Sequence, residues 1–342
     1  MGHRQKRPPL RRASLLVGAL VLAVTAAVMG AAASAKPTAP AQSIQVGLIT
    51  KDVTNPFFVK MRLGATREAK RLGAGLKYAA GKSSSDNAAQ IAAIENMTTA
   101  GVKGILITVA DAKAENAAIA KARKAGVLVI ALDSPTTPKS AVDALFATNN
   151  VNAGILIGKY ARAATKGKKV TIAMLDEHAG SSVGAQRHSG FLKGFGIKSS
   201  DKQIACVGNG QGQTAPSQTA MENCLQKNPD INVVYTINEP TAAGAHTALT
   251  AAGKAKDVVV VSVDGGCDGV RDVQGGAIAA TAQQYPLRMA ELGVAAGAEF
   301  IRSGKKPSGY TDTGVALIAA TPVAGVESKD VATGMALCFG RK

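Results

Sequence analysis

Residues 44–79, IQVGLITKDVTNPFFVKMRLGATREAKRLGAGLKYA, contain the pattern that decides the fold. The run 44–50 is short and almost entirely apolar, which is typical of a strand buried on both faces of a sheet. Apolar residues then recur at helical spacing from 58 to 72, and a second short apolar run follows at 75–79. A strand, a helix and a strand in this order predict a parallel βαβ unit.

The same alternation continues along the chain and restarts once. Further strands are predicted at 104–109, 127–132, 144–148, 169–175, 203–207, 232–237, 258–263, 277–283 and 314–319. Further helices are predicted at 91–97, 114–125, 183–196, 215–227, 241–253, 267–275 and 287–303. Two such runs predict an α/β protein with two doubly wound domains, in which helices cover both faces of parallel sheets.

The first 35 residues have the composition of an export signal. Five basic residues and no acidic residue precede an apolar run at 15–33 that ends in the small residues ASA. We therefore predict a secretory signal peptide at 1–35, cleaved at about Ala35/Lys36, and a linker at 36–43. An uncleaved anchor is the alternative, because nineteen apolar or small residues nearly span a bilayer. We favour cleavage and a periplasmic location, by the general secretory route rather than the twin-arginine route.

The formal net charge of +17 is at first sight that of a nucleic-acid-binding protein. Five of these charges lie in the predicted signal peptide, and removing five from +17 leaves +12. The remaining lysines and arginines form no run of five or six and are not interleaved with aromatic residues. We therefore predict a solvated basic surface and no nucleic-acid partner.

The four cysteines all lie in the second half of the chain, at Cys206, Cys224, Cys267 and Cys338. Export permits disulfides, and four cysteines allow three pairings between which sequence alone does not choose. We prefer Cys206–Cys224 with Cys267–Cys338, and four reduced, buried thiols are the alternative. The cysteines and histidines do not have metal-ligand spacing, so we predict no metal site.

Polar residues that directly follow the apolar runs are the candidate ligand contacts, because ligands bind beyond the carboxyl ends of parallel strands. These candidates are the segment 51–55, Asp111, Asp133, Ser134, Asn149, Asn150, the segment 176–187, Asn238, Glu239, Asp264, Gln283 and Gln284. Carboxylates, amides and an arginine can pair with the vicinal hydroxyls of a sugar. The rings of Phe57 and Phe58 can cover its C–H face.

The same residues do not form the machinery of an enzyme. A glycosidase needs two carboxylates at a defined separation, and sugar binding accounts for Asp133 and Asp264 without that requirement. The glycine-rich segment 208–212 reads G-x-G-x-G and lacks the spacing of a dinucleotide-binding loop. We predict a binding protein without catalytic activity or cofactor.

Four segments resemble the ribose-type periplasmic sugar-binding proteins of ABC importers, and the likeness covers about 44–320. The segments are TNPFF at 54–58, VIALD at 129–133, TNN at 148–150 and VSVDG at 261–265. The resemblance implies a type I fold, in which two Rossmann-like domains joined by three crossovers close on one sugar. It implies an N-terminal lobe formed by 44–148 plus 285–310 and a C-terminal lobe formed by 149–284 plus 311–342.

Position by position, the resemblance implies sugar contacts from both lobes. They are Asn55, Phe57, Phe58, Asp133, Ser134, Arg187, Asn238, Asp264 and Gln284. Two departures from the family pattern enlarge the pocket and make it more polar, because Ser134 replaces an arginine and the loop 210–213 replaces a phenylalanine. They favour a hexose. The sequence looks most similar to fructose-binding members, so D-fructose is our first expectation, followed by ribose, galactose and allose.

Some of these residues also have a purely structural interpretation. Asn55 can start a helix before its proline, and at least one of the two phenylalanines is expected to pack into the core. Arg187 can pair with Glu177 or Asp176, and Asn149-Asn150 can be hinge structure.

The resemblance also implies a monosaccharide ligand, a membrane permease as partner and a monomeric chain. Two alternatives stay open. A sugar sensor would present its bound state to a chemotaxis or kinase receptor, and the ligand domain of a sugar-responsive repressor shares this fold. The repressor reading needs an N-terminal helix-turn-helix, whereas the segment before the first strand is predicted to be a signal peptide.

Overall fold

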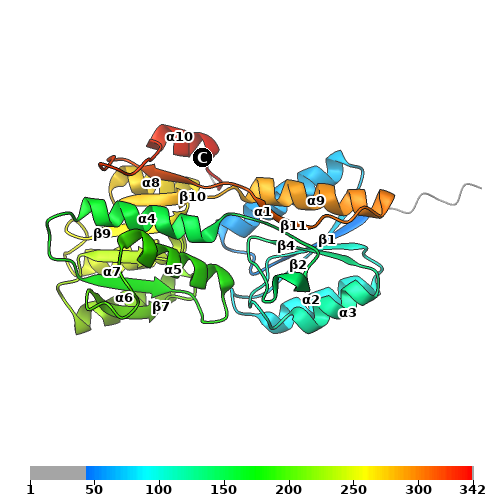
Figure 1. Cartoon of the computed structure of the whole chain (residues 1–342), viewed down its shortest axis with the longest axis horizontal. Helices are drawn as coiled ribbons and strands as arrows, with labels where there is room; N and C mark the ends of the chain where they lie inside the picture. The colour runs from blue at the N-terminus through cyan, green and yellow to red at the C-terminus, as the bar shows by residue number, and fades with distance from the viewer. Residues whose placement is uncertain (1–43, 341–342) are drawn as a thin grey trace, which may run out of the picture. The chain divides into compact units, whose positions relative to one another are not determined.

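The computed structural model describes residues 44–340 (Figure 1). The signal peptide expected at 1–35 and the linker expected at 36–43 lie outside the described residues. The described part of the chain contains two six-stranded sheets. Apolar side chains pack on both faces of each sheet, as the sequence predicts for strands buried between helices.

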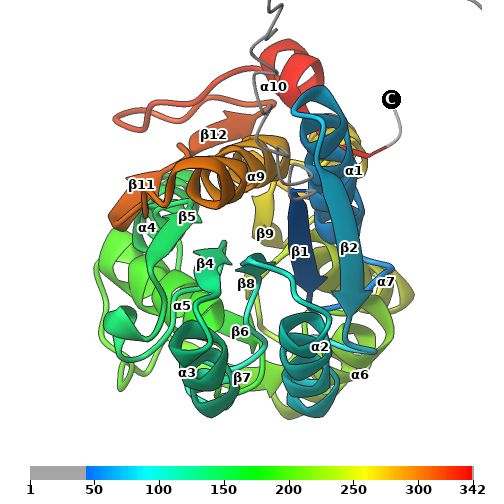
Figure 2. The same cartoon turned by 90° about the vertical axis from the view of Figure 1, so that its right-hand side faces the viewer.

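The first sheet has the strand order β11-β5-β4-β3-β1-β2, and its strands are all parallel. They are β1 (Gln45–Thr50), β2 (Gly75–Ala80), β3 (Gly104–Ile107), β4 (Leu128–Leu132), β5 (Ala144–Ala147) and β11 (Gly309–Asp312). Helices on both faces cover this sheet, with α9 and α3 on opposite sides of β4 (Figure 2). One face carries α1 (Pro56–Arg71) and α9 (Pro286–Ser303), and the other carries α2 (Asn87–Thr99) and α3 (Asn116–Lys124). We call this sheet with these helices the first lobe.

The second sheet has the order β12-β10-β9-β8-β6-β7, and only β12 runs antiparallel within it. Its strands are β6 (Ile172–Asp176), β7 (Ile204–Asn209), β8 (Val233–Thr236), β9 (Val259–Asp264), β10 (Ala280–Gln283) and β12 (Ala316–Ala319). One face carries α4 (Asn150–Ala164) and α5 (Ser182–Phe195), and the other carries α6 (Thr214–Lys227) and α7 (Glu239–Ala251). At the β12 edge, α8 (Cys267–Gly275) packs against α10 (Val331–Leu337). These elements form the second lobe.

The chain passes between the two sheets three times. It crosses between β5 and β6, between β10 and β11, and between β11 and β12. The predicted fold class is confirmed, since this is a pair of doubly wound, Rossmann-like domains joined by three crossovers. Strand β11 pairs with β5 as far as Asp312, so the third crossing lies after 312 and not at 310 as expected.

The predicted strands agree with the observed ones to within a few residues. Four elements were absent from the prediction, namely α4, β11, α10 and the short 3-10 helix η1 (Lys139–Ala141). Helix α4 follows the asparagine pair expected to be a hinge, and its two glycines weaken the helical pattern. Strand β11 (GYTD) is a short edge strand without an apolar alternation. Helix α10 is a single short helix of seven residues.

Polar side chains cap the first turn of several helices. In each case the side-chain oxygen accepts a backbone N–H from the first helical turn. The capping residues are Asn55, Asp86, Asn149, Ser181, Asn238 and Asp330.

The preferred cysteine pairing is confirmed. Cys206 is bonded to Cys224, which joins β7 to α6. Cys267, at the start of α8, is bonded to Cys338, just after α10. The second disulfide therefore holds the end of the described chain against the second lobe.

Candidate functional site

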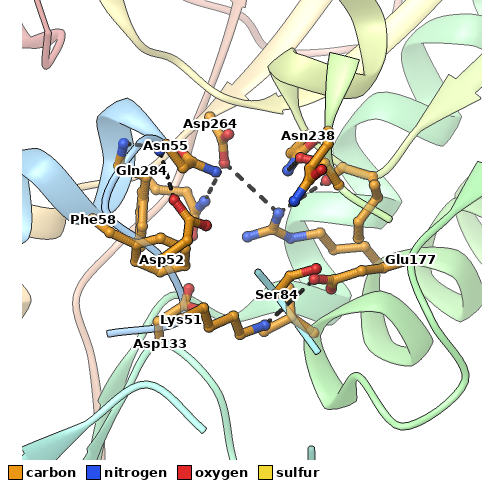
Figure 3. A pocket seen from close by; sticks show the side chains of 16 residues that line it. Lys51, Asp52, Asn55, Phe58, Ser84, Asp133, Glu177, Asn238, Asp264 and Gln284 are labelled. Atoms are coloured by element: carbon orange, nitrogen blue, oxygen red, sulfur yellow. Dashed lines mark hydrogen bonds and ion pairs between the residues drawn. The ribbon is translucent and has the colours of Figure 1, made fainter. Parts of the chain in front are cut away.

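A cavity lies where the carboxyl ends of the strands of both lobes meet (Figure 3). The first lobe contributes Lys51, Asp52, Asn55, Phe57, Phe58, Ser84 and Asp133. The second lobe and the second crossing contribute Glu177, Val183, Arg187, Gly212, Gln213, Ile237, Asn238, Asp264 and Gln284. Eight of the nine residues predicted as ligand contacts are therefore brought together on one surface.

The ninth, Ser134, is buried but does not belong to this lining. Its hydroxyl donates a hydrogen bond of 2.8 Å to Asp133 Oδ2. Asp133 Oδ1 is buried and has no hydrogen-bond partner within residues 44–340. Ser134 thus fixes one carboxylate oxygen of Asp133 and leaves the other available to a ligand.

Asp133 and Asp264 occupy matching positions, directly after β4 and at the end of β9. Both have positive backbone angles, with φ of 62° at Asp133 and 142° at Asp264. Such angles are unfavourable for residues other than glycine and concentrate at functional sites. Both carboxylates are almost completely buried, so the sharp change of direction at each strand end turns a carboxylate into the cavity.

Arg187, on α5, links Asp264 directly, and Asp133 through Asn150. Its Nε donates to Asn150 Oδ1 and its Nη1 donates to the Ile237 carbonyl oxygen, each at 2.9 Å, and Nη1 lies 3.7 Å from Asp264 Oδ1. Asn150 in turn donates to the backbone oxygen of Asp133 at 3.3 Å. The arginine pairs with Asp264 and not with the sequence neighbours considered as alternatives. Asn150, expected to be a hinge residue, is a buried support of the site.

Four side-chain amides line the cavity, those of Asn55, Gln213, Asn238 and Gln284, and two of them also cap helices. Asn55 Oδ1 accepts the Phe57 N–H at the start of α1, and Asn238 Oδ1 accepts the Thr241 N–H at the start of α7. Gln284 donates from Nε2 to Asp264 Oδ1 at 2.8 Å. Its Oε1 is buried and unpartnered among the described residues. Asn55 therefore starts α1, as its structural interpretation predicts, and its side chain also lies at the cavity.

The two phenylalanines have both of the roles considered for them. Phe57 and Phe58 are 3% and 6% exposed and belong to the apolar layer of the first lobe, yet both line the cavity. Their rings are edge to face, with centroids 5.4 Å apart. Such a pair provides an apolar wall of fixed orientation.

Three charged residues of the lining, Lys51, Asp52 and Glu177, were not among the predicted contacts, and two of them form an ion pair. Lys51 Nζ, after β1, lies 3.6 Å from Glu177 Oε1, after β6, and both side chains are buried (Figure 3). Both residues fall in segments that follow strands, which marks them as candidates. Their pairing has no sequence signal, because 126 positions separate them in the chain.

Several further contacts cross from one lobe to the other. Ser84 donates to the Gln211 carbonyl oxygen at 2.8 Å, and the Ala112 N–H donates to the Gly180 carbonyl oxygen at 3.0 Å. Ser84 was missed because it is one of three successive serines, at 83–85, in the loop after β2. Of the glycine-rich segment 208–212, Gly212 lines the cavity. These contacts close the cavity between the lobes.

Burial and neighbouring charges shift the protonation of two carboxylates. Burial raises the pKa of Asp264 to about 7, against the Arg187 guanidinium, and the Asp133 carboxylate adds to the rise. Burial also acts to raise the pKa of Glu177, but the Lys51 ammonium and the Ser181 hydroxyl hold it below its usual range. Both carboxylates therefore depend on a cationic partner to carry charge inside the protein.

The described residues contain no cluster of histidine, cysteine and acidic side chains that could bind a metal ion. In residues 44–340, no helix has the length and apolar character needed to cross a membrane. What the cavity offers is a set of paired hydrogen-bonding groups beside two aromatic rings. That arrangement suits recognition of a small polyhydroxylated molecule.

Residues 46–306 match the periplasmic binding protein domain family. The chain is 32% identical over 302 residues to the ribose import binding protein of Escherichia coli (strain K12), covering 88% of this chain and 96% of that protein. A solute-binding protein of Actinobacillus succinogenes 130z with bound D-allose is similar in structure, with a TM-score of 0.72 and 28% identity, over 80% of this chain and 97% of that one. A solute-binding protein of Mycobacterium smegmatis with bound glycerol gives a TM-score of 0.75 and 27% identity, over 88% and 98%. The chain therefore belongs to the periplasmic binding protein family, among the substrate-binding proteins of ABC transporters and not among enzymes.

Proposed function

We propose that this protein captures a neutral monosaccharide between its lobes and delivers it to the membrane permease of an ABC importer. The observation that carries the proposal is the convergence of eight strand-end and helix-start residues on one closed cavity. The relatives named above support it, since one is a ribose import protein and another holds D-allose.

The chemistry of the lining suits a sugar. A sugar hydroxyl both donates and accepts, so it can satisfy a carboxylate and an amide or arginine at once. Asp133 Oδ1 and Gln284 Oε1 are buried acceptors without partners in the described chain, and they can accept from two such hydroxyls. The apolar edge of Phe57 and Phe58 can lie against the C–H groups of the ring.

The charge of the lining favours a neutral sugar over a sugar acid or a sugar phosphate. Four carboxylates line the cavity, at Asp52, Asp133, Glu177 and Asp264, against the two cations of Lys51 and Arg187. Each cation already lies beside a carboxylate, at 3.6 Å and 3.7 Å. An anionic ligand would therefore enter an acidic cavity without a free cation on its lining.

We further propose a hexose, with D-fructose first and ribose, galactose and allose behind it. Two features support this choice. Ser134 occupies a position where ribose binders carry an arginine, and Gly212 and Gln213 are the lining residues of a loop where they carry a phenylalanine. Smaller side chains at both positions leave room for an additional hydroxymethyl group.

The proposed mechanism is binding coupled to closure of the lobes. The three crossing segments, at 148–150, at 283–286 and between Asp312 and β12, would act as hinges. A sugar that contacts both lobes would shift the population toward the closed form. The closed form would then present both lobes together to the permease. On this mechanism residues 44–148 with 285–312, and residues 149–284 with 313–340, move as two bodies.

A thermal-shift screen against D-fructose, D-allose, D-galactose, D-ribose and D-glucuronate tests the proposal. We expect the largest stabilisation from a hexose and none from the glucuronate. The Asp264→Ala variant should lose the sugar response without unfolding, while Asp257→Ala, an exposed change in the same lobe, should keep it.

Each part of the proposal has its own negative result. No stabilisation of the wild type by any of the neutral sugars would reject sugar capture. An unchanged sugar response in Asp264→Ala would reject the site. Tighter binding of ribose than of every hexose in calorimetric titration would reject the enlarged pocket.

A further inference from the structure

The segment that follows α10 is fixed to the second lobe. Cys338 is bonded to Cys267, and the Cys267 N–H donates to the Phe339 carbonyl oxygen at 2.7 Å. Gly266 and Phe339 also form an isolated parallel bridge. The backbone of Phe339 is therefore held against the start of α8 and the turn before it.

The ring of Phe339 lies between the lobes, because it packs on the first lobe and also lies close to Gly266 of the second. It is 3% exposed and belongs to the apolar layer formed by α1, α9 and the first sheet. It contacts Phe57 edge to face, with ring centroids 5.7 Å apart and ring planes at 78°. The residue thus has its backbone in the second lobe and its side chain packed against the first.

Phe57 connects this contact to the cavity. It lines the cavity and also meets Phe58 edge to face at 5.4 Å. Phe339 therefore packs on a residue of the cavity wall from outside the cavity. We propose that Phe339 is a positioning residue that supports Phe57 from the second lobe when the lobes are closed. The Cys267–Cys338 disulfide holds Phe339 in place for this role. This inference rests on the proposed sugar-binding function.

The expected effect follows from the strength of such contacts. An edge-to-face pair and the area it buries form only when the two lobes meet, so they stabilise the closed form relative to the open form. Loss of the contact should weaken sugar binding by roughly three- to tenfold. The change should appear mainly in the dissociation rate, because the open form that first meets the sugar is unaffected.

The test compares two disulfides of the same lobe. Phe339→Ala and the double variant Cys267→Ser/Cys338→Ser remove the ring or its anchor, and Cys206→Ser/Cys224→Ser removes a disulfide between β7 and α6 that contributes no residue to the cavity. Each is titrated with D-fructose and with D-allose, and its melting temperature is measured without sugar. Phe339→Leu, which keeps apolar volume, serves as the conservative variant.

We expect Phe339→Ala and the Cys267/Cys338 variant to lose affinity to a similar extent, and their combination to lose little more. Phe339→Leu should recover part of the affinity. The Cys206/Cys224 variant should lower the melting temperature and leave the affinity within about twofold, since a disulfide acts mainly on the unfolded chain. Unchanged affinity in a folded Phe339→Ala variant, or equal losses from both disulfides, would overturn the proposal.

Hydrogen exchange provides a readout that does not depend on the sugar. Because the sugar-free protein also samples the closed form, Phe339→Ala should reduce that population and speed exchange in a peptide that covers the start of α1, and the Cys206/Cys224 variant should not. If the wild type binds none of the neutral sugars of the thermal-shift screen, the proposed function fails, and this exchange difference still decides whether Phe339 positions Phe57. Equal exchange in wild type and Phe339→Ala would overturn the positioning role.

Discussion

The Lys51 ammonium and the Glu177 carboxylate meet across the cleft at 3.6 Å, with their side chains only 4% and 7% exposed. One residue follows the first strand of the first lobe, and the other follows the first strand of the second lobe. Closure of the lobes therefore takes both charges out of water and pairs them in the same step. A buried charge that loses its partner is strongly unfavourable.

Lys51→Met should accordingly weaken sugar binding by about 10- to 100-fold. In this variant, closure would bury Glu177 without its ammonium partner. The melting temperature of the sugar-free protein should change little, because the lobes can stay open and leave Glu177 in water. Calorimetric titration with D-fructose and a thermal melt measure the two quantities.

Two companion variants isolate the pair. Lys51→Met/Glu177→Met should bind more tightly than Lys51→Met alone, because it removes the uncompensated charge. Lys256→Met, an exposed lysine of the second lobe, should match the wild type. A double variant that binds no better than Lys51→Met would show that the ion pair does not control closure.

The raised pKa of Asp264 predicts a pH dependence with a definite sign. Its folded value of about 7 exceeds the value near 4 of an aspartate in the unfolded chain, so the native state keeps a proton that the unfolded state has lost. The contribution of Asp264 to stability is present below about pH 4 and is lost as the pH rises through 7. The sugar-free Asp264→Asn variant should therefore gain stability relative to the wild type as the pH is raised from 5 to 8.

Thermal melts of both proteins across this range measure the difference. Asp257→Asn, which changes an exposed carboxylate, should show no such trend. A difference between wild type and Asp264→Asn that stays constant from pH 5 to 8 would mean that Asp264 does not titrate in this interval.

The sequence predicted the fold well because the relevant signal is local. Short apolar runs such as that of β4 indicate buried strands, and their alternation with helices predicts a doubly wound sheet. Helix α4 was missed because its glycines, which lower helical propensity, are required by its close packing on α5. That requirement exists only in the folded structure.

The residues of the site likewise fall into two groups, those that local sequence patterns predict and those that they do not. Asp133, Asn238 and Asp264 could be found from sequence because they follow strands, and parallel strands end at one edge. The Lys51–Glu177 pair and the contact between Phe57 and Phe339 join residues that are far apart in the chain. Such pairings depend on how the two lobes meet, which no local pattern encodes.

The close approach of α4 and α5 gives a last prediction, in which packing reaches the site through Arg187. A Cβ atom at Gly154 would lie 2.3 Å from the Arg187 carbonyl oxygen and 2.8 Å from the Phe191 backbone nitrogen. These are backbone atoms, so Gly154→Ala must push the helices apart and move the turn that carries Arg187. We expect the free energy of unfolding to fall by about 1–3 kcal/mol. Sugar affinity should fall as well, because the Arg187 guanidinium shifts from Asp264.

Gly275→Ala is the matched control, since Gly275 is also helical and a Cβ atom there meets open space. This variant should be neutral or slightly stabilising. Urea unfolding and titration of both variants decide the question, and equal stability of the two would mean that α4 and α5 can separate without cost.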